Sequence, residues 1–223
     1  SVLVNGIPAT KPATQVDAET SIVLQGDRKD FVSRGGHKLA GALDVFTEVT
    51  VEGKICLDAG ASTGGFTDVL LRRGASLVVA VDVGYGQLAW ELRQDARVKI
   101  LDRTNIRHLT GEQVGEDIDL VVADLSFISL SLVLPALAAV SKPEADFVLM
   151  VKPQFEVGRE KLGAGGVVRD PALRRSAVLD VAESAYDVGL GTMGIAASPL
   201  PGPAGNVEYF LWLRRGAPAI DEQ

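Results

Sequence analysis

Five short apolar runs, separated by segments with helical spacing, constrain the fold of this chain more than any other feature. The runs are rich in Val, Ile and Leu, which is typical of strands buried on both faces of a parallel sheet. Alternation of such strands with helices predicts a doubly wound α/β fold. The five predicted strands are Ile55–Asp58, Leu77–Val81, Val98–Leu101, Leu120–Ala123 and Phe147–Val151.

Two later apolar segments bring the expected total to seven strands. Ser33 can cap the first helix, and the remaining helices follow from the 3.6-residue spacing of apolar side chains. We therefore expect a mainly parallel seven-stranded sheet with helices on both faces. The predicted helices are Gly35–Phe46, Gly65–Arg73, Gln87–Arg93, Leu130–Val140 and Pro171–Gly189, and the last two strands are Met193–Ser198 and Glu208–Leu213.

The first 24 residues differ from this pattern. Val2–Val4 precedes Asn5-Gly6, a dipeptide that favours a tight hairpin turn, and Ile22–Leu24 is a second short apolar run. These residues predict one β-hairpin, which is too small to bury a core by itself. A hydrophilic linker is expected from Gln25 to Asp30.

The balance of charge argues against nucleic acid as a partner. Lys and Arg number 22 and Asp and Glu number 29, so the net charge is −7, and an acidic protein repels a phosphate backbone at long range. The basic residues nevertheless gather in groups, although such groups are more often solvated surface than binding sites. The groups are Lys29, Arg34, His37 and Lys38; Arg103, Arg107 and His108; and Arg159, Lys161, Arg169, Arg174 and Arg175.

Cysteine and histidine are scarce. Cys56 is the single cysteine, so it has no partner within the chain, and a reducing cytoplasm is the expected location. With only two histidines besides, we expect no bound metal. No apolar run reaches 18 residues, so neither a membrane span nor a membrane partner is expected.

The strongest local signal is the segment Asp58–Thr67, with sequence DAGASTGGFT, between a predicted strand and a predicted helix. Glycines in such a turn let the backbone approach a ligand and expose amide groups to it. The spacing matches neither the dinucleotide pattern GxGxxG nor a P-loop. An acid at the strand end suits the ammonium group of an amino-acid-bearing ligand, and S-adenosylmethionine has that group.

Further acids follow neighbouring strands. Asp82 lies 24 residues after Asp58, close to the spacing of an acid that binds ribose hydroxyls, and Asp102 follows the third strand. The alternative is that these acids only cap helices or turns. Phe66 is a candidate for contact with a ring of the cofactor, although it could equally be a core residue. The predicted cofactor-binding residues are Asp58, Gly60, Ser62, Thr63, Gly64, Gly65, Phe66, Asp82, Val83, Asp102 and Asp124.

Asp124 and Lys152 end the fourth and fifth strands. A buried ammonium needs a partner, so the two predict either a structural ion pair or a reactive one. Methyl transfer to an alcohol requires removal of the hydroxyl proton, and a lysine near other cations in a dry site can serve as the base. Lys38 would be the second cation, and Glu208 could orient Lys152 or the hydroxyl. The predicted catalytic residues are Lys38, Asp124, Lys152 and Glu208.

These motifs resemble the TlyA or haemolysin A family of rRNA methyltransferases, within the FtsJ-like group. The resemblance extends over nearly the whole chain and is most specific at SRGGHKL (residues 33–39), Asp58–Thr67, Asp82–Trp90, Val151–Val157 and GNVEYF (residues 205–210). It implies a Rossmann-like class I methyltransferase fold over residues 31–216, with a tail at residues 217–223. Residues 1–30 would be the remnant of an S4-like RNA-binding domain plus linker.

The resemblance also implies a function. The FtsJ-like group has a Lys-Asp-Lys-Glu tetrad, matched here by Lys38, Asp124, Lys152 and Glu208. The implied reaction is S-adenosylmethionine-dependent 2′-O-methylation of cytidine in 16S and 23S rRNA, within ribosomal subunits. The family's modification is linked to capreomycin and viomycin susceptibility. Expected RNA-binding residues are Arg34, His37, Arg103, Arg159 and Lys161.

Two other functions stay open at this stage. One is a membrane-active haemolysin, for which the sequence offers no amphipathic or membrane-spanning segment. The other is a non-catalytic RNA-binding factor in ribosome assembly, against which the complete tetrad argues. Phe66, Tyr85 and Phe127 could flank adenine or a flipped base, although such residues are more often core. The oligomeric state is not predicted.

Overall fold

The computed structural model describes residues 2–4, 7–8, 16, 20, 22–24, 30–158 and 162–220, and the chain forms two compact units, residues 1–30 and 31–223. In the first unit, β1 (Val2–Val4) pairs antiparallel with both β2 (Ile7–Pro8) and β3 (Ile22–Leu24). The predicted hairpin is thus a three-stranded sheet. Its predicted turn, most of the predicted linker and the last three residues of the predicted tail lie outside the described residues.

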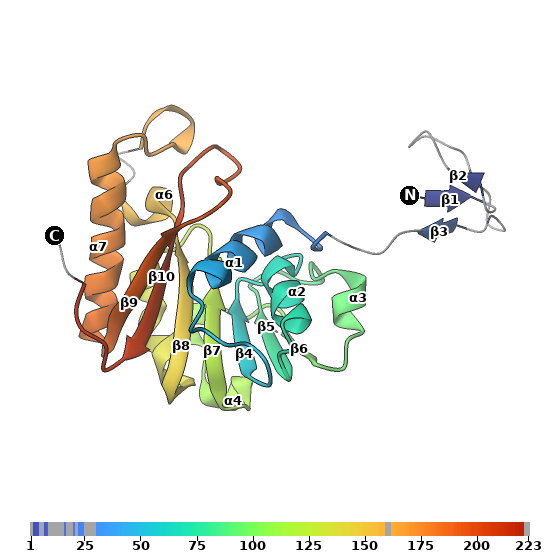
Figure 1. Cartoon of the computed structure of the whole chain (residues 1–223), viewed down its shortest axis with the longest axis horizontal. Helices are drawn as coiled ribbons and strands as arrows, with labels where there is room; N and C mark the ends of the chain where they lie inside the picture. Colours follow the sequence, from blue (N-terminus) through green and yellow to red (C-terminus); the bar gives the residue numbers. More distant parts are fainter. Residues whose placement is uncertain are drawn as a thin grey trace. The chain divides into compact units, whose positions relative to one another are not determined.

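The second unit contains a seven-stranded sheet with the order β6-β5-β4-β7-β8-β10-β9 (Figure 1). The five strands β6, β5, β4, β7 and β8 are parallel to one another, and β10 is antiparallel to both β8 and β9. The prediction of a mainly parallel seven-stranded sheet is confirmed. The strands are β4 (Ile55–Ala59), β5 (Leu77–Val81), β6 (Val98–Leu101), β7 (Ile118–Ala123), β8 (Ser141–Val151), β9 (Leu190–Ala197) and β10 (Tyr209–Arg215).

The helices agree with the predicted positions but differ in length. Residues 82–89 form turns because the Asp82 and Asp102 carboxylates accept the N–H groups of Gly84 and Gly86, so the predicted helix from Gln87 is shorter. The helices are α1 (Arg34–Val45), α2 (Gly65–Arg72), α3 (Trp90–Arg93), α4 (Gly111–Val114), α5 (Leu134–Ala139), α6 (Pro153–Glu156), α7 (Pro171–Asp187) and the 3₁₀ turns η1 (Ile106–His108), η2 (Leu130–Leu132) and η4 (Ala164–Gly166). The predicted helix over 130–140 is therefore divided at Val133, between η2 and α5.

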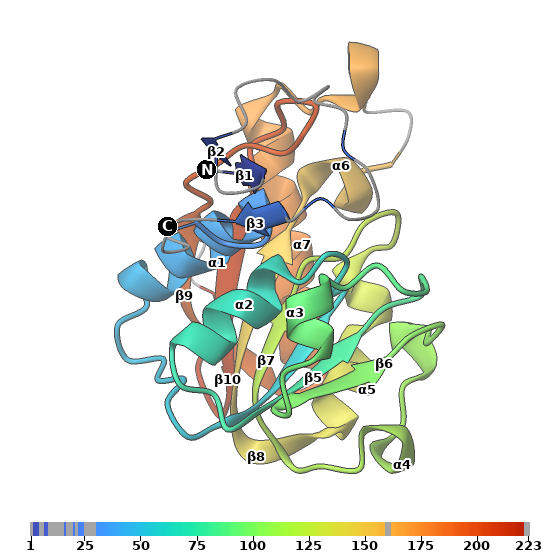
Figure 2. The same cartoon turned by 90° about the vertical axis from the view of Figure 1, so that its right-hand side faces the viewer.

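Helices cover both faces of the sheet (Figure 2). Side chains alternate along each strand, so Cys56 faces the layer of α1, α2 and α3, and Leu57 faces the layer of α4, α5 and α7. Both cores are apolar, and the central strands β4, β5 and β7 between them have almost no exposed surface. This two-sided burial explains why the strands lack the alternation of polar and apolar residues seen in half-exposed sheets.

Cys56 is completely buried in the α1–α2 layer. Burial raises the pKa of its thiol to about 12, which leaves it protonated at neutral pH. Among the described residues, no helix combines the length and apolar character that crossing a bilayer requires.

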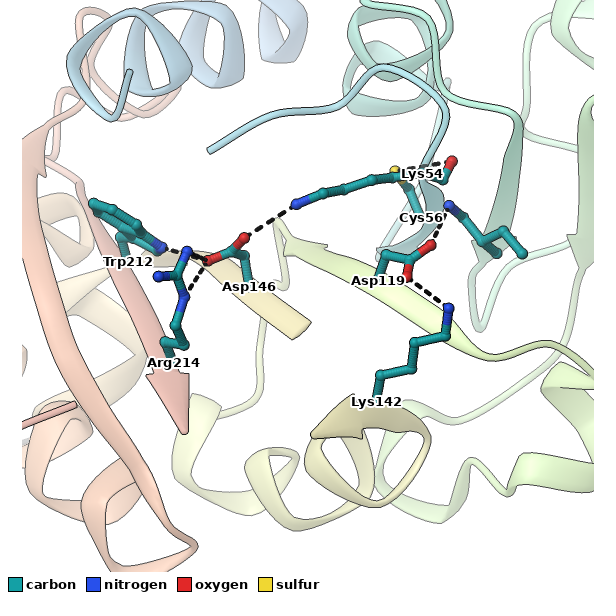
Figure 3. A network of polar contacts seen from close by, with 8 residues as sticks. Lys54, Cys56, Asp119, Lys142, Asp146, Trp212 and Arg214 are labelled. Atoms are coloured by element: carbon teal, nitrogen blue, oxygen red, sulfur yellow. Dashed lines mark hydrogen bonds and ion pairs between the residues drawn. The ribbon is translucent and has the colours of Figure 1, made fainter. Parts of the chain in front are cut away.

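Asp146 anchors a polar network at the end of the sheet where β4 and β7 begin (Figure 3). The carboxylate is 3% exposed and accepts hydrogen bonds from Lys54 Nζ at 3.1 Å, Trp212 Nε1 at 2.9 Å and Arg214 Nε at 3.0 Å. These bonds join β8 to β10 and to the segment before β4. A buried acid with several partners at this position fixes the register of the long strand β8.

Asp119 forms the second half of this network. It accepts hydrogen bonds from the Ile55 backbone N–H at 2.9 Å and from Lys142 Nζ at 2.8 Å (Figure 3). Partial burial opposes its ionisation, but these donors outweigh that effect and lower the pKa of Asp119. The network therefore holds the strand starts together, and the opposite ends of the strands are left for a ligand site.

Candidate active site

The loop between β4 and α2 has the backbone shape that its glycines permit. Gly60 has φ +86°, and a Cβ there would lie 2.6 Å from the Asp124 carbonyl oxygen, so a side chain would overlap the loop that follows β7. Gly64, with φ +99°, caps α2 in the left-handed region. Ser62 also has positive φ, at +48°. The loop therefore presents its backbone, rather than side chains, to the space above the strand ends.

Asp58 lies beneath this loop with no exposed surface. Its Oδ2 accepts a hydrogen bond of 2.6 Å from Thr67 Oγ1, while Oδ1 has no hydrogen-bond partner among the described residues. Burial is the main reason that the pKa of Asp58 rises to about 7; the Thr67 bond opposes the rise, and the nearby Asp124 and Asp82 carboxylates add to it. A cation bound nearby would stabilise the ionised form of such an acid.

Asp82 and Asp102 organise the next two loops. Asp82 accepts the Ser62 N–H at 2.8 Å and the Gly84 N–H at 2.7 Å, which joins the glycine loop to the end of β5. Asp102 accepts the Gly86 N–H at 3.0 Å and lies 3.5 Å from Arg93. Asp102 thus orders the loop before α3 and lines neither of the two cavities at the strand ends, whereas Asp82 lines one of them.

Two cavities lie above the carboxyl ends of the parallel strands. The apolar cavity, of about 420 Å³, is lined by Gly60, Ser62, Asp82, Val83, Gln87, Asn105, Ile106, Asp124, Leu125, Ser126, Phe127, Ile128 and Val133. The polar cavity, of about 460 Å³, is lined by Ser33, Arg34, Gly35, Lys38, Gly60, Ala61, Ser62, Thr63, Gly65, Phe66, Asp124, Ser126, Lys152, Pro201 and Pro203. They share Gly60, Ser62, Asp124 and Ser126, so the two cavities meet at these residues.

Two ion pairs lie at the polar cavity. Lys152 Nζ is 2.6 Å from Asp124 Oδ1, and Lys38 Nζ is 2.5 Å from Glu208 Oε2. Lys38, Lys152 and Glu208 are 7%, 9% and 1% exposed. The four predicted catalytic residues are thus brought together as two lysines and two acids of opposite charge, which is the arrangement that buried charges require.

The partner of Glu208 differs from the prediction. Glu208 was expected to orient Lys152 or a hydroxyl, but it contacts Lys38 and accepts a bond of 3.3 Å from Gln154 Nε2. The reason is topological: β10 is antiparallel to β8 with Tyr209 opposite Val151, so Glu208 lies at the sheet edge where β8 ends, and there it meets Lys38 of α1. Lys152 instead donates to Ser126 Oγ at 3.0 Å.

The other predicted ligand-binding residues divide into two groups. Asp58, Gly64 and Asp102 line neither cavity and act from beneath or beside the loops. Those that line one cavity or both are Gly60, Ser62, Thr63, Gly65, Phe66, Asp82, Val83 and Asp124. Phe66 is 3% exposed and packs against Phe210 at 6.1 Å between ring centroids, so it is partly core.

The predicted RNA contacts are more scattered. Arg34 lines the polar cavity, and His37 packs edge-on against Phe31. Arg103 lies 4.3 Å from the centre of the Tyr85 ring. Arg159 and Lys161 lie outside the described residues. Of the three predicted RNA contacts that the structure describes, Arg34 alone lines the polar cavity.

The polar site residues that the sequence prediction missed are Ser33, Gln87, Asn105 and Ser126, which line the cavities, and Gln154, which bonds Glu208. Ser126 and Gln154 each lie two residues after a predicted catalytic residue, Asp124 or Lys152. That proximity was the available signal. Phe127, at 91% exposed and with φ +66°, is the most exposed large apolar residue at the cavities.

The apolar cavity suits the S-adenosylmethionine that the sequence predicts. Its walls include Val83, Ile106 and Ile128, which match an adenine ring, and Asp82 stands where ribose hydroxyls would be bound. Next to it, the closely packed Gly60 backbone and the partly unsatisfied Asp58 carboxyl suit an amino-acid moiety with a positive charge. The residues present therefore fit that ligand.

Comparisons with known proteins agree with this geometry. The model of the FtsJ-like methyltransferase family matches residues 31–215. The chain is 60% identical over 214 residues to the 16S/23S rRNA (cytidine-2′-O)-methyltransferase TlyA of Mycobacterium tuberculosis, covering 96% of this chain and 80% of that protein. A solved structure from Streptococcus thermophilus, proposed as a hemolysin by its description, is 43% identical and superposes with a TM-score of 0.83 over 99% of this chain and 81% of that one.

A more distant structure shows the fold alone. The S-adenosylmethionine-dependent methyltransferase from Mesorhizobium loti is 16% identical, with a TM-score of 0.57 over 78% of this chain and 96% of that chain. Its likeness confirms the predicted Rossmann-like methyltransferase architecture.

Proposed function

This chain belongs to the FtsJ-like methyltransferase family, and from that premise we propose that it transfers a methyl group from S-adenosylmethionine to the 2′-hydroxyl of cytidine in 16S and 23S rRNA. Ribosomal subunits in the cytoplasm are the proposed substrate. The observation that carries the proposal is the cluster of Lys38, Asp124, Lys152 and Glu208 at the polar cavity, next to the point where the apolar cavity joins it.

The cluster has the groups that methylation of a hydroxyl requires. When bound, S-adenosylmethionine supplies an electrophilic methyl group on a sulfonium cation. Lys152 lines the polar cavity beside Asp124, one of the residues that the two cavities share. Its amine can accept the hydroxyl proton, and Asp124 then stabilises the ammonium that forms. Lys38 lines the same cavity and can hold the ribose or an adjacent phosphate, while Glu208 balances its charge.

The surrounding residues orient the acceptor. Arg34 at the polar cavity can contact the RNA backbone, and Pro201 and Pro203 on the loop before β10 line the same cavity. The predicted contacts Arg103, Arg159, Lys161 and His37 extend this proposal to a wider RNA surface. The net charge of −7 means that RNA binding depends on this local grouping rather than on overall attraction.

Transfer of tritium from labelled S-adenosylmethionine to isolated ribosomal subunits, followed by nuclease mapping, tests the proposal. The wild-type chain should label a cytidine ribose, and Lys152→Ala should lose transfer while it still binds the cofactor in calorimetry. Lys142→Ala is the matched control, because Lys142 pairs with Asp119 at the opposite end of the strands. Absence of label, or label on a base, contradicts the proposal.

The proposed modification extends to antibiotic response and separates the enzyme from a haemolysin. Expression in a host lacking the modification should increase susceptibility to capreomycin and viomycin, and Lys152→Ala should not. In dye-release assays on liposomes, the protein should cause no lysis. Lysis by both the wild type and Lys152→Ala would favour a haemolysin instead.

A further inference from the structure

Ser126 lies where the two cavities meet. It is an exposed residue on the loop after β7, and it is one of the four residues that line both the apolar and the polar cavity. The only polar side-chain atom of Ser126 is its hydroxyl, which accepts a hydrogen bond of 3.0 Å from Lys152 Nζ. The hydroxyl is therefore in contact with the lysine that the proposed function uses as the base.

The contacts of Lys152 restrict the direction of its lone pair. Its Nζ lies 2.6 Å from Asp124 Oδ1 and 3.0 Å from Ser126 Oγ. A neutral lysine amine has two N–H bonds and one lone pair in a tetrahedral arrangement around nitrogen. Ser126 accepts one of those N–H bonds, and the negatively charged Asp124 carboxylate, which is an ion-pair partner at 2.6 Å, repels the lone pair. The lone pair therefore takes the direction that faces neither residue.

The loop that holds Ser126 is anchored without the help of its hydroxyl. Ser129 Oγ donates to Glu156 Oε2 at 2.5 Å, and the Leu130 backbone N–H donates to Glu156 Oε1 at 3.0 Å. Leu125, on the other side, is buried in the core. Removing the Ser126 hydroxyl should thus leave the loop in place, which separates an effect on Lys152 from a general loss of structure.

We propose that Ser126 is a positioning residue that, together with Asp124, points the Lys152 lone pair at the acceptor hydroxyl. This inference rests on the proposed function. In the step concerned, the 2′-O–H proton passes to the Lys152 lone pair, the oxygen electron pair forms a bond to the methyl carbon, and the methyl–sulfur bond breaks with its electron pair retained by sulfur. The products are the 2′-methyl ether, S-adenosylhomocysteine and a Lys152 ammonium, which later releases its proton to water.

Ser126→Ala, Ser126→Thr and Ser131→Ala distinguish this role from others. Ser126→Ala should lower kcat by about tenfold or more, which is part of the roughly 10²–10⁴-fold that a general base contributes. KM for ribosomal subunits and cofactor affinity should change less than about twofold. Ser126→Thr retains the hydroxyl and should restore most of kcat. Ser131 lies in η2, five residues after Ser126, and bonds Ser184 at 2.9 Å outside both cavities, so Ser131→Ala should resemble the wild type.

The pH dependence gives a readout that a purely structural role would not change. Ser126 Oγ accepts from the Lys152 ammonium and so favours its charged form; removing it should move the rising limb of the pH–rate profile to lower pH in Ser126→Ala alone. An effect confined to KM would indicate direct substrate contact and would overturn the inference, as would an unchanged kcat.

A second measurement is independent of RNA methylation. Carbon-13 labelling of lysine Cε lets the Lys152 signal be assigned by its absence in Lys152→Met and titrated in the full chain. The midpoint should fall in Ser126→Ala and stay unchanged in Ser131→Ala. If the wild type fails to methylate RNA, the proposed function is wrong, but this titration still decides whether Ser126 controls Lys152: an unchanged midpoint rejects it.

Discussion

Lys38 on α1 and Glu208 before β10 are 170 positions apart in the chain, and their side chains meet at 2.5 Å between Nζ and Oε2. The pair joins the first helix of the second unit to its last strand at the polar cavity. Because both side chains are almost fully buried, each charge depends on the other for compensation.

Glu208→Ala should therefore destabilise the fold. It leaves a buried, unpaired ammonium, which costs roughly 3–5 kcal/mol of unfolding free energy. Urea unfolding followed by circular dichroism measures the change. Glu183→Ala, at an exposed position on α7, is the control and should differ from the wild type by less than about 0.5 kcal/mol. Equal effects of the two variants would contradict the argument.

Asp58→Asn should change how stability depends on pH. The pKa of Asp58 is raised from 3.8 to about 7 in the folded chain, so between about pH 4 and pH 7 the folded state binds more protons than the unfolded state. The raised pKa of Asp58 therefore contributes fully to the unfolding free energy below about pH 4, and this contribution is lost as the pH rises through about 7. Asn remains neutral throughout and avoids that loss.

The unfolding free energy of Asp58→Asn should differ little from that of the wild type at pH 4. By pH 8 the variant should be more stable by a few kcal/mol, because each pKa unit corresponds to about 1.4 kcal/mol. Urea unfolding at a series of pH values measures it. Calorimetry should show weaker binding of S-adenosylmethionine to the variant. A constant difference in stability across this pH range would refute the assignment.

Gly60→Ala should reduce cofactor affinity by tenfold or more. The added Cβ would meet the Asp124 carbonyl oxygen at 2.6 Å and would also occupy positive φ. Gly53→Ala separates the two effects, because Gly53 has φ +73° and a Cβ added there would have no other atom within 4 Å. Gly53→Ala should lose about 1–2 kcal/mol of stability through backbone strain alone. Gly60→Ala should lose more because of the added overlap, and only Gly60→Ala should lose affinity in calorimetry. Similar affinities of the two variants for S-adenosylmethionine would count against a close approach of the Gly60 backbone to the cofactor.

Asp146→Ala should lower stability without loss of methyl transfer. It removes the acceptor of the buried Trp212 N–H and of two basic side chains at the strand starts, which should cost roughly 1–3 kcal/mol. Thermal unfolding measures the loss, and transfer assays well below the melting temperature test retention of activity. Asp117→Ala, an exposed acid nearby, is the control. A selective loss of transfer would show that the network affects the site.

The sequence predicts the central strands well because apolar runs such as Leu77–Val81 are buried on both faces and have no competing pattern. It fails for the first half of β8, where Lys142, Pro143 and Glu144 resemble a loop, yet the segment continues the strand. Its pairing depends on β7, with Ser141 opposite Ile118. Such pairing brings together residues distant in sequence, which local patterns do not encode.

The site shows the same limit. Strand-end positions identified Asp124 and Lys152 as neighbours, because carboxyl ends of parallel strands meet at one crevice. The choice of partner for Glu208 depends on how α1 packs across the sheet, and sequence spacing holds no information about that approach. Ser126 was missed for a different reason, since one serine hydroxyl in a loop has no distinctive pattern.

Burial of Cys56 has a practical consequence for following this protein in solution. Its thiol is fully enclosed and stays protonated, so a maleimide dye should leave the folded chain unmodified. One cysteine introduced on the surface, for example at Tyr85, would then be the single labelled position without any need to replace Cys56. Fluorescence from that label could report the arrival of a ribosomal subunit in real time.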